Sequence, residues 1–230
     1  MTGTLGELII AALAFLLIHI IPSSFLRGQL VSKIGEKGYL AGFSLLSTVI
    51  LVWLVLAYRA VPAEEMLWNA GNTGRYLGIL LMLIASILFV GGITSPNPTA
   101  VGAGRLIDRD SAFEGFNAIT RHPLMWSFAL WSLAHVINNG DVPAIIFFST
   151  FGLLALAGTA LIDAKKAQQL NDGWKSYKAR TSNIPFAAIL QDRATLSIKP
   201  LWWRILLGIV LYAALFHFHG FIFGVSPAPF

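Results

Sequence analysis

Six long runs of apolar residues dominate the chain, and segments richer in polar residues, Gly and Pro separate them. A helix needs roughly 17–25 apolar residues to cross a bilayer, and five runs reach or approach that length while the fourth is shorter. The runs are apolar on all sides and lack the alternation of barrel strands, so they predict helices. The expected spans are Leu5–Ile21, Tyr39–Tyr58, Tyr76–Ile93, Pro123–Ile137, Val142–Ile162 and Leu201–Gly224. The pattern predicts an all-α integral membrane bundle of about six transmembrane helices, as one domain over residues 1–230.

Two of the polar segments are long, 94–120 and 163–200. The first opens with Ser95-Pro96-Asn97-Pro98 and is expected to be irregular at its start. The second is predicted to be helical from Asp163 to about Arg180 and to end before Pro185. We expect this helix to be solvated and attracted to anionic lipid headgroups.

Composition supports the membrane assignment. Hydrophobic residues make up 56% of the chain and charged residues 12%, whereas soluble domains average about 25% charged residues. The absence of Cys excludes a disulfide scaffold, an iron–sulfur centre and a thiol nucleophile. The net charge of +5 does not indicate nucleic acid as a partner, because no basic-aromatic module accompanies it.

The positive charges predict the orientation. Of the 16 Lys and Arg residues, all but Arg59 and Arg75 follow the first, third or fifth run or lie at the start of the sixth. The positive-inside rule therefore predicts cytoplasmic long loops and both termini outside, in a multi-pass protein of a bacterial inner membrane with periplasmic termini. The lipid bilayer is the expected partner, and the sequence leaves the oligomeric state open.

Histidines supply the candidate chemistry, and the chain has five: His19, His122, His135, His217 and His219. Ionisable side chains within a bilayer are costly and often functional, although one His can also form only a helix–helix hydrogen bond. Neutral imidazole is a common metal ligand, and the spans hold no Cys and one carboxylate, Glu7. Haem iron held by two imidazoles is the first candidate, and a zinc or copper site made of His alone is the second.

Depth in the bundle limits which histidines can pair. Consecutive spans run in opposite directions, so His19 and His122 are both expected near the cytoplasmic face. His135 lies 13 residues beyond His122, about 20 Å along a helix, and therefore nearer the outside. Geometry alone leaves two pairings open: His19 with His122, or His135 with His217 or His219.

Several segments together resemble the NnrU family of membrane proteins. They run in family order over nearly the whole chain: His19-Ile-Ile-Pro22-Ser23, Arg27, Tyr39, Ser47, Arg121-His122-Pro123-Leu124, Trp131-Ser-Leu-Ala-His135, Asn139-Gly140-Asp141 and His219-Gly-Phe-Ile-Phe-Gly224-Val-Ser-Pro227. The family was named for bacterial denitrification and also includes the plastid 15-cis-zeta-carotene isomerase, a haem b protein.

The resemblance implies haem b (iron) with His19 and His135 as ligands, and His122 as an alternative or redox-dependent substitute. These three histidines are the expected catalytic residues, and Arg121 and Arg27 are expected to bind haem propionates through their guanidinium groups. The plant enzyme is thought to exchange a ligand for Cys on reduction. This chain has no Cys, so that exchange is impossible here.

The resemblance implies two activities: redox-dependent cis–trans isomerisation of a hydrophobic polyene, or an accessory role with a partner of nitrite or nitric oxide metabolism. A non-catalytic assembly protein, whose histidines only pack, is the alternative. The pattern of Arg121-His122-Pro123 with Tyr177-Lys178-Ala179-Arg180 is also similar to membrane methyltransferases that use S-adenosylmethionine. Met125 and Asp163-Ala164-Lys165-Lys166 depart from their tyrosine and paired acids, which ranks methyl transfer last.

Overall fold

The protein is a bundle of long helices with a cap at one end. The computed structural model describes residues 2–24, 26–62 and 65–229, with only the backbone for 22–24. All regular secondary structure in these ranges is helical: α1 Leu5–Ser24, α2 Arg27–Ala60, α3 Gly71–Thr94, η1 Gly104–Leu106, η2 Asp110–Phe113, α4 Phe116–Ile119, α5 Pro123–Asn138, α6 Val142–Arg180, α7 Ala187–Leu190 and α8 Trp202–Phe223.

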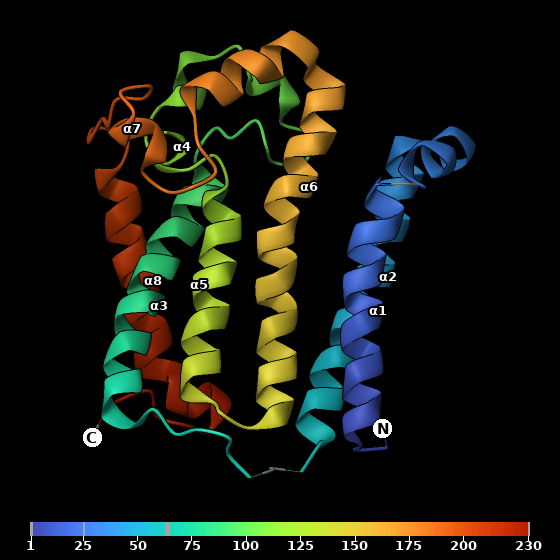
Figure 1. Cartoon of the computed structure of the whole chain (residues 1–230), viewed down its shortest axis with the longest axis vertical. Coiled ribbons are helices and arrows are strands. Elements are labelled where there is room, and N and C mark those ends of the chain that lie inside the picture. Colours follow the sequence, from blue (N-terminus) through green and yellow to red (C-terminus); the bar gives the residue numbers. More distant parts are fainter. Residues whose placement is uncertain (1, 25, 63–64, 230) are drawn as a thin grey trace.

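The six long helices stand side by side (Figure 1). Helix α3 packs against α5 and α8, α5 packs against α6, and the α1–α2 hairpin packs against α6 from the other side. Both chain ends lie at the end of the bundle opposite the cap (Figure 1). Large apolar side chains such as Leu45, Leu153 and Phe221 remain 61–91% exposed on the outside, which a bilayer accommodates and water does not.

Every expected span corresponds to a helix. Helices α2, α3, α6 and α8 are each long and apolar enough to cross a membrane. Helix α1 contains a shorter apolar stretch, Leu5–Ile21, and α5 has 16 residues. The all-helical membrane fold predicted from the apolar pattern is therefore confirmed.

Local chemistry sets the helix ends. Pro residues occupy the first turns of α5 and α6, where the missing N–H is harmless, and the Asp141 carboxylate accepts a hydrogen bond from the Ala144 N–H at 3.0 Å. Helix α8 ends at Gly224, which adopts the left-handed conformation with φ 76°. Gly208 lets α8 cross α3 closely, because a Cβ there would stand 2.5 Å from the Ile87 Cα.

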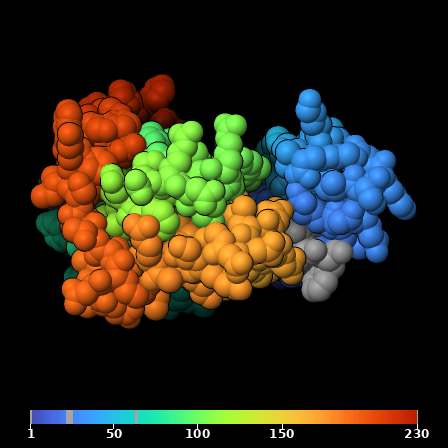
Figure 2. All heavy atoms as spheres, turned by 90° about the horizontal axis from the view of Figure 1, so that it is seen from above, coloured from blue at the N-terminus to red at the C-terminus, as the bar shows by residue number. Residues whose placement is uncertain are grey.

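The cap consists of residues 95–122 and 163–201, which correspond closely to the two long polar segments 94–120 and 163–200 of the sequence. Seen from the cap end, the green and orange segments cover the α3–α5–α6–α8 bundle, whereas the blue α1–α2 end lies beside them (Figure 2). The cap has its own small core of Ile107, Ala112, Trp174 and Tyr177. The expected helix after Asp163 does reach Arg180, across a kink at Asn171, but it is not solvated on all sides, because Trp174 and Tyr177 pack on the other cap segment.

Candidate functional site

His19 lies near the cap end of α1 and links α1 to α2. Its Nδ1 is 2.7 Å from the carbonyl oxygen of Phe15, and its Nε2 is 3.2 Å from the Ser47 hydroxyl oxygen. The imidazole packs on the Phe15 ring at 4.4 Å and meets the Phe43 ring edge-on at 5.4 Å. Both ring nitrogens therefore have polar neighbours within the α1–α2 hairpin.

His135 lies in the last turn of α5, near the end of the bundle opposite the cap. Its Nδ1 is 2.8 Å from the Trp131 carbonyl oxygen, and its Nε2 has no hydrogen-bond partner among the described residues. The ring stacks on Phe148 of α6 at 4.6 Å and faces the His219 ring of α8 at 6.5 Å. The expected proximity of His135 to a C-terminal histidine is thus present in the fold.

The structure does not bring His19 and His135 together. The rings of Phe15, Phe151 and Trp131 lie in series between them, with centroid spacings of 4.4, 5.3, 5.5 and 4.9 Å from His19 to His135. His19 is one turn beyond Phe15 towards the cap, and His135 is one turn beyond Trp131 in the opposite direction. The two imidazoles therefore make no ring contact with each other and extend from this row of rings in opposite directions along their helices.

His122 and Arg121 lie in a buried cluster under the cap, on the loop that leads into α5. The Asp163 carboxylate accepts hydrogen bonds from His122 Nε2 at 2.6 Å and from Arg121 Nε at 3.1 Å. Arg121 Nη1 also donates to the Thr181 carbonyl oxygen at 3.2 Å. The residues His122 and Arg121 are only 2% and 6% exposed. His19 pairs with neither of them.

Burial and charge within this cluster shift two pKa values. Asp163 follows the apolar stretch 142–162 and is half buried. Burial alone would raise its pKa, but the hydrogen bond and charge of His122 and the charge of Arg121 lower it below the usual value. Burial raises the pKa of the Tyr177 hydroxyl, whose oxygen has no partner among the described residues. His122 Nδ1 is likewise buried without a partner in the described part of the chain.

Sequence reasoning missed Asp163 as the partner of Arg121 and His122. The available signal was a carboxylate directly after an apolar run, at the same predicted membrane face as the Arg-His pair. Arg27, the other expected propionate partner, pairs with the Glu36 carboxylate and lies 5.3 Å from the Tyr39 ring centre. Arg27 begins α2, whereas Arg121 lies on the loop before α5, and each already contacts a carboxylate.

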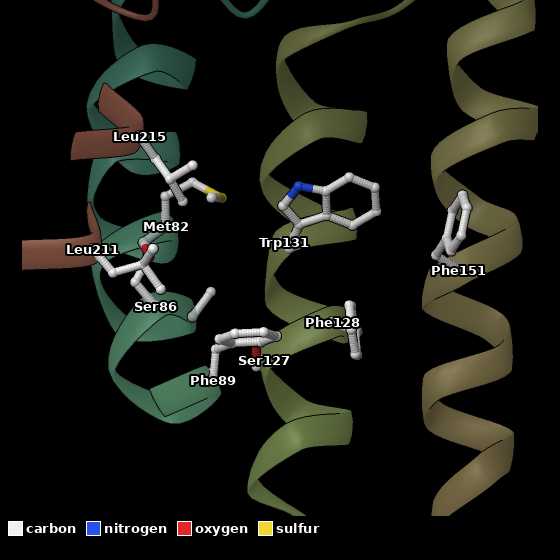
Figure 3. A pocket seen from close by; sticks show the side chains of 10 residues that line it. Met82, Ser86, Phe89, Ser127, Phe128, Trp131, Phe151, Leu211 and Leu215 are labelled. Atoms are coloured by element: carbon white, nitrogen blue, oxygen red, sulfur yellow. The ribbon is translucent and has the colours of Figure 1, made fainter. Parts of the chain in front are cut away.

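An apolar cavity of about 370 Å³ lies between α3, α5 and α8 (Figure 3). Its walls are almost entirely apolar: Met82, Ala85, Ser86, Phe89, Ser127, Phe128, Trp131, Phe151, Leu211 and Leu215. The Trp131 indole nitrogen points towards the α3 and α8 side of this space (Figure 3). His135 and His219 follow the lining residues Trp131 and Leu215 by one helical turn each, and neither histidine lines the cavity itself.

His135 and His219 do not belong to a larger group of metal-ligating side chains in the described part of the chain. Within the described residues no group of three or more His, Cys, Asp or Glu side chains could hold a metal ion. Metal-ligating histidines usually donate the other ring N–H to a carbonyl or carboxylate, and His135 and His219 both place Nδ1 at a backbone carbonyl oxygen. Haem iron can take its protein ligands from His side chains.

Comparison with known proteins gives three results. The chain is 39% identical over 84 residues to the chloroplastic 15-cis-zeta-carotene isomerase of Arabidopsis thaliana, and 34% identical over 84 residues to that of Zea mays. In each case the match covers 36% of this chain and 22% of the plant protein, so the chain spans about a fifth of these relatives. No solved structure matches. The sequence model of the NnrU protein family matches residues 7–227, and the chain therefore belongs to the NnrU family.

Proposed function

We propose that the protein is a haem b-dependent cis–trans isomerase of a linear polyene dissolved in the bilayer. The observation that carries the proposal is the apolar cavity, with the facing imidazoles of His135 and His219 one helical turn beyond two of its lining residues. The similarity to two carotene isomerases supports the substrate class, because both relatives are 15-cis-zeta-carotene isomerases.

The cavity suits a segment of a long hydrocarbon. Its volume of about 370 Å³ falls within the range of small-molecule sites. The aromatic side chains of Phe89, Phe128 and Trp131 can pack flat against a conjugated chain. The apolar walls exclude water, which keeps a polarised double bond from being hydrated during rotation.

His135 is the residue we propose as an iron ligand. Trp131 O accepts its Nδ1–H, which fixes the tautomer and leaves the Nε2 lone pair for the metal. Bound haem b would supply a reversible one-electron donor that lowers the order of a conjugated double bond until rotation is complete. Because the two isomers have the same composition, the reaction consumes no electrons and no co-substrate.

We also propose the orientation and location. The cap is cytoplasmic and both termini lie outside, in a bacterial inner membrane. The support is the distribution of positive charge, because the cap carries most of the Lys and Arg residues while the opposite end carries Arg59 and Arg75.

The test combines a spectrum with product analysis. Protein purified in detergent from haem-supplied cells is expected to give a Soret band with sharp α and β bands after reduction by dithionite. The reduced protein, and not the oxidised protein, is then expected to convert a 15-cis polyene to its 15-trans isomer in chromatographic analysis. A haem-loaded protein that is equally inactive in both redox states would contradict the isomerase assignment.

A matched pair of variants separates the cavity from the cofactor. Ala85 is 3% exposed and lines the cavity, so Ala85→Leu is expected to fill part of it. This variant should keep the haem spectrum and lose isomerisation. The lipid-facing Ile84→Leu, one residue away and 40% exposed, should keep both. Equal activity of the two variants would remove the cavity from the proposal.

A further inference from the structure

The chain folds back on itself at the cap-side start of α2. Gly35 interrupts the helix with φ 73° and ψ 164°, a conformation that is essentially restricted to glycine. On a straight helix, Arg27 and Tyr39 would lie about 18 Å apart along the axis. Instead, the guanidinium carbon of Arg27 lies 5.3 Å from the centre of the Tyr39 ring. Residues 27–36 thus form a hook, which bends away from the rest of α2 at the cap-side end of the hairpin (Figure 1).

Arg27 is only partly engaged within the hook. Its Nη2 donates to the Glu36 carboxylate, whereas its Nε is buried and donates to no acceptor among the described residues. The Arg27 side chain is 20% exposed, so the guanidinium still reaches the surface. A guanidinium has five N–H donors in a planar fork that matches the oxygens of a carboxylate or a phosphate. Arg27 therefore has donors left for an anion.

Lys165 of α6 is a second cation beside the hook. It follows the apolar stretch 142–162 and therefore lies at the level of the lipid headgroups. Lys165 is half buried, and it forms no ion pair with the residues that the structure describes. Burial and the positive charge of Arg27 both lower the pKa of Lys165, so the two cations repel each other across the boundary between α2 and α6.

A third cation follows directly in the sequence. Lys166 is only 6% exposed, and its Nζ donates to the Ala100 carbonyl oxygen at 3.1 Å. Within the described ranges, neither lysine has a carboxylate partner, and Glu36 is the one acid that the hook supplies. Partly buried cations are unfavourable unless an anion compensates them. Three cations and one carboxylate therefore leave an excess of positive charge at this edge of the bundle.

From these contacts we propose that Arg27 and Lys165 bind the phosphate group of an anionic phosphate ester between α2 and α6, at the cap-side surface of the membrane. The fork of Arg27 suits two phosphate oxygens, and Lys165 supplies a point charge from the other helix. A phosphate in this position replaces the repulsion between the two cations by two attractions. Phospholipid headgroups supply this chemistry within the bilayer, and free phosphate supplies it in water. The site depends on neither haem nor the apolar cavity.

The experiment measures lipid binding to the full chain by native mass spectrometry in a neutral detergent. The probes are dioleoyl phosphatidylglycerol, whose headgroup is anionic, and dioleoyl phosphatidylcholine, whose headgroup is neutral overall. Wild type is expected to retain phosphatidylglycerol in preference. Lys165→Gln is expected to weaken that binding about tenfold, because it removes a charge-assisted contact to the phosphate. The control Lys33→Gln removes an exposed charge from the hook and should change binding less than about twofold.

A variant with an effect of opposite sign separates a ligand site from a structural role. Glu36→Gln releases the Arg27 guanidinium and removes the negative charge that competes with the phosphate. We therefore expect it to bind phosphatidylglycerol more tightly than wild type. Loss of the Arg27–Glu36 pair could only loosen the hook, so a damaged structure would not produce tighter binding.

Inorganic phosphate identifies the source of the ligand. If millimolar phosphate displaces phosphatidylglycerol from wild type, the phosphate group alone is recognised and a soluble ester can occupy the site. If it does not, the acyl chains contribute and the ligand is a lipid. Both outcomes uphold the site. The proposal is overturned if wild type retains the two lipids equally, or if Lys165→Gln and Lys33→Gln retain phosphatidylglycerol alike.

Discussion

Replacing Asp163 by Ala tests how the cap is attached to the bundle. The Asp163 carboxylate is the shared acceptor for His122 Nε2 at 2.6 Å and Arg121 Nε at 3.1 Å. The side chains of Arg121, His122 and Asp163 are 7%, 1% and 18% exposed, so water cannot replace the carboxylate without opening the cap. The variant leaves a buried guanidinium without its counter-ion.

The expected cost follows from this burial. Removing one partner of a buried ion pair costs about 3–5 kcal/mol, because the remaining charge stays desolvated. Asp163→Asn keeps the shape and one acceptor, so its expected cost is about 1–3 kcal/mol. The control is Asp172→Ala in the same helix. Its partner is Lys175, and both side chains are at least 80% exposed, so we expect a change within about 0.5 kcal/mol.

The assay is the free energy of unfolding in mixed detergent micelles, measured at several pH values. The pKa of Asp163 is lowered in the folded protein. Its stabilising contribution is therefore complete above the unfolded value of about 3.9 and is lost as the pH falls through the folded pKa. The gap between wild type and Asp163→Ala should shrink below about pH 4. If Asp163→Ala is no less stable than Asp172→Ala at pH 7, the cluster does not hold the cap.

Three further predictions concern packing and can be measured as shifts in thermal unfolding in detergent. Gly208→Leu places a side chain where a Cβ would already lie 2.5 Å from the backbone of α3, so it is expected to lower the free energy of unfolding by at least about 1–3 kcal/mol. A Gly208→Leu variant as stable as wild type would show that α8 does not cross α3 at this position. Ser132→Ala removes the 2.8 Å hydrogen bond to the buried Phe148 carbonyl oxygen, for about 0.5–1.5 kcal/mol, whereas Ser132→Thr should lose less. Leu8 is fully buried in α1, and Leu8→Ala is expected to lower the free energy of unfolding by about 1–2 kcal/mol. This is less than the cost of about 2–5 kcal/mol in soluble cores, because the side chain of an unpacked membrane helix meets lipid rather than water. Leu13→Ala, 52% exposed on the same helix, should change little, and equal costs would refute the packing of α1.

The apolar runs predict the helices well because one physical requirement, satisfaction of backbone hydrogen bonds in lipid, decides them. The cap is harder, since its helices face water on one side and protein on the other. The spacing of Leu170, Trp174 and Tyr177, four and three residues apart, is an amphipathic signal that the sequence contained. Its partner face, around Ile107 and Ala112, comes from a separate loop with no regular pattern.

The candidate site was only partly predictable, because contacts between separate segments leave no regular pattern in the sequence. Alternating helix direction and the rise per residue place His135 at the depth of the C-terminal histidines, and the fold brings His135 to His219. Depth alone also allowed His19 to meet His122. Lateral contacts decide against that pair: the His19 ring lies against Phe43 and Ser47 of α2, whereas His122 meets Asp163 of α6. Hydropathy carries no information about such lateral order.

His19 and His135 show how one local geometry can serve two roles. Each ring places Nδ1 at the carbonyl oxygen four residues earlier in its helix. They differ at Nε2, where His19 lies 3.2 Å from the Ser47 hydroxyl of α2. A serine at this position ties two helices together at a depth where few other polar groups occur. Ser47→Ala should therefore weaken the α1–α2 hairpin and leave the haem spectrum unchanged, whereas a spectral change would place His19 at the iron.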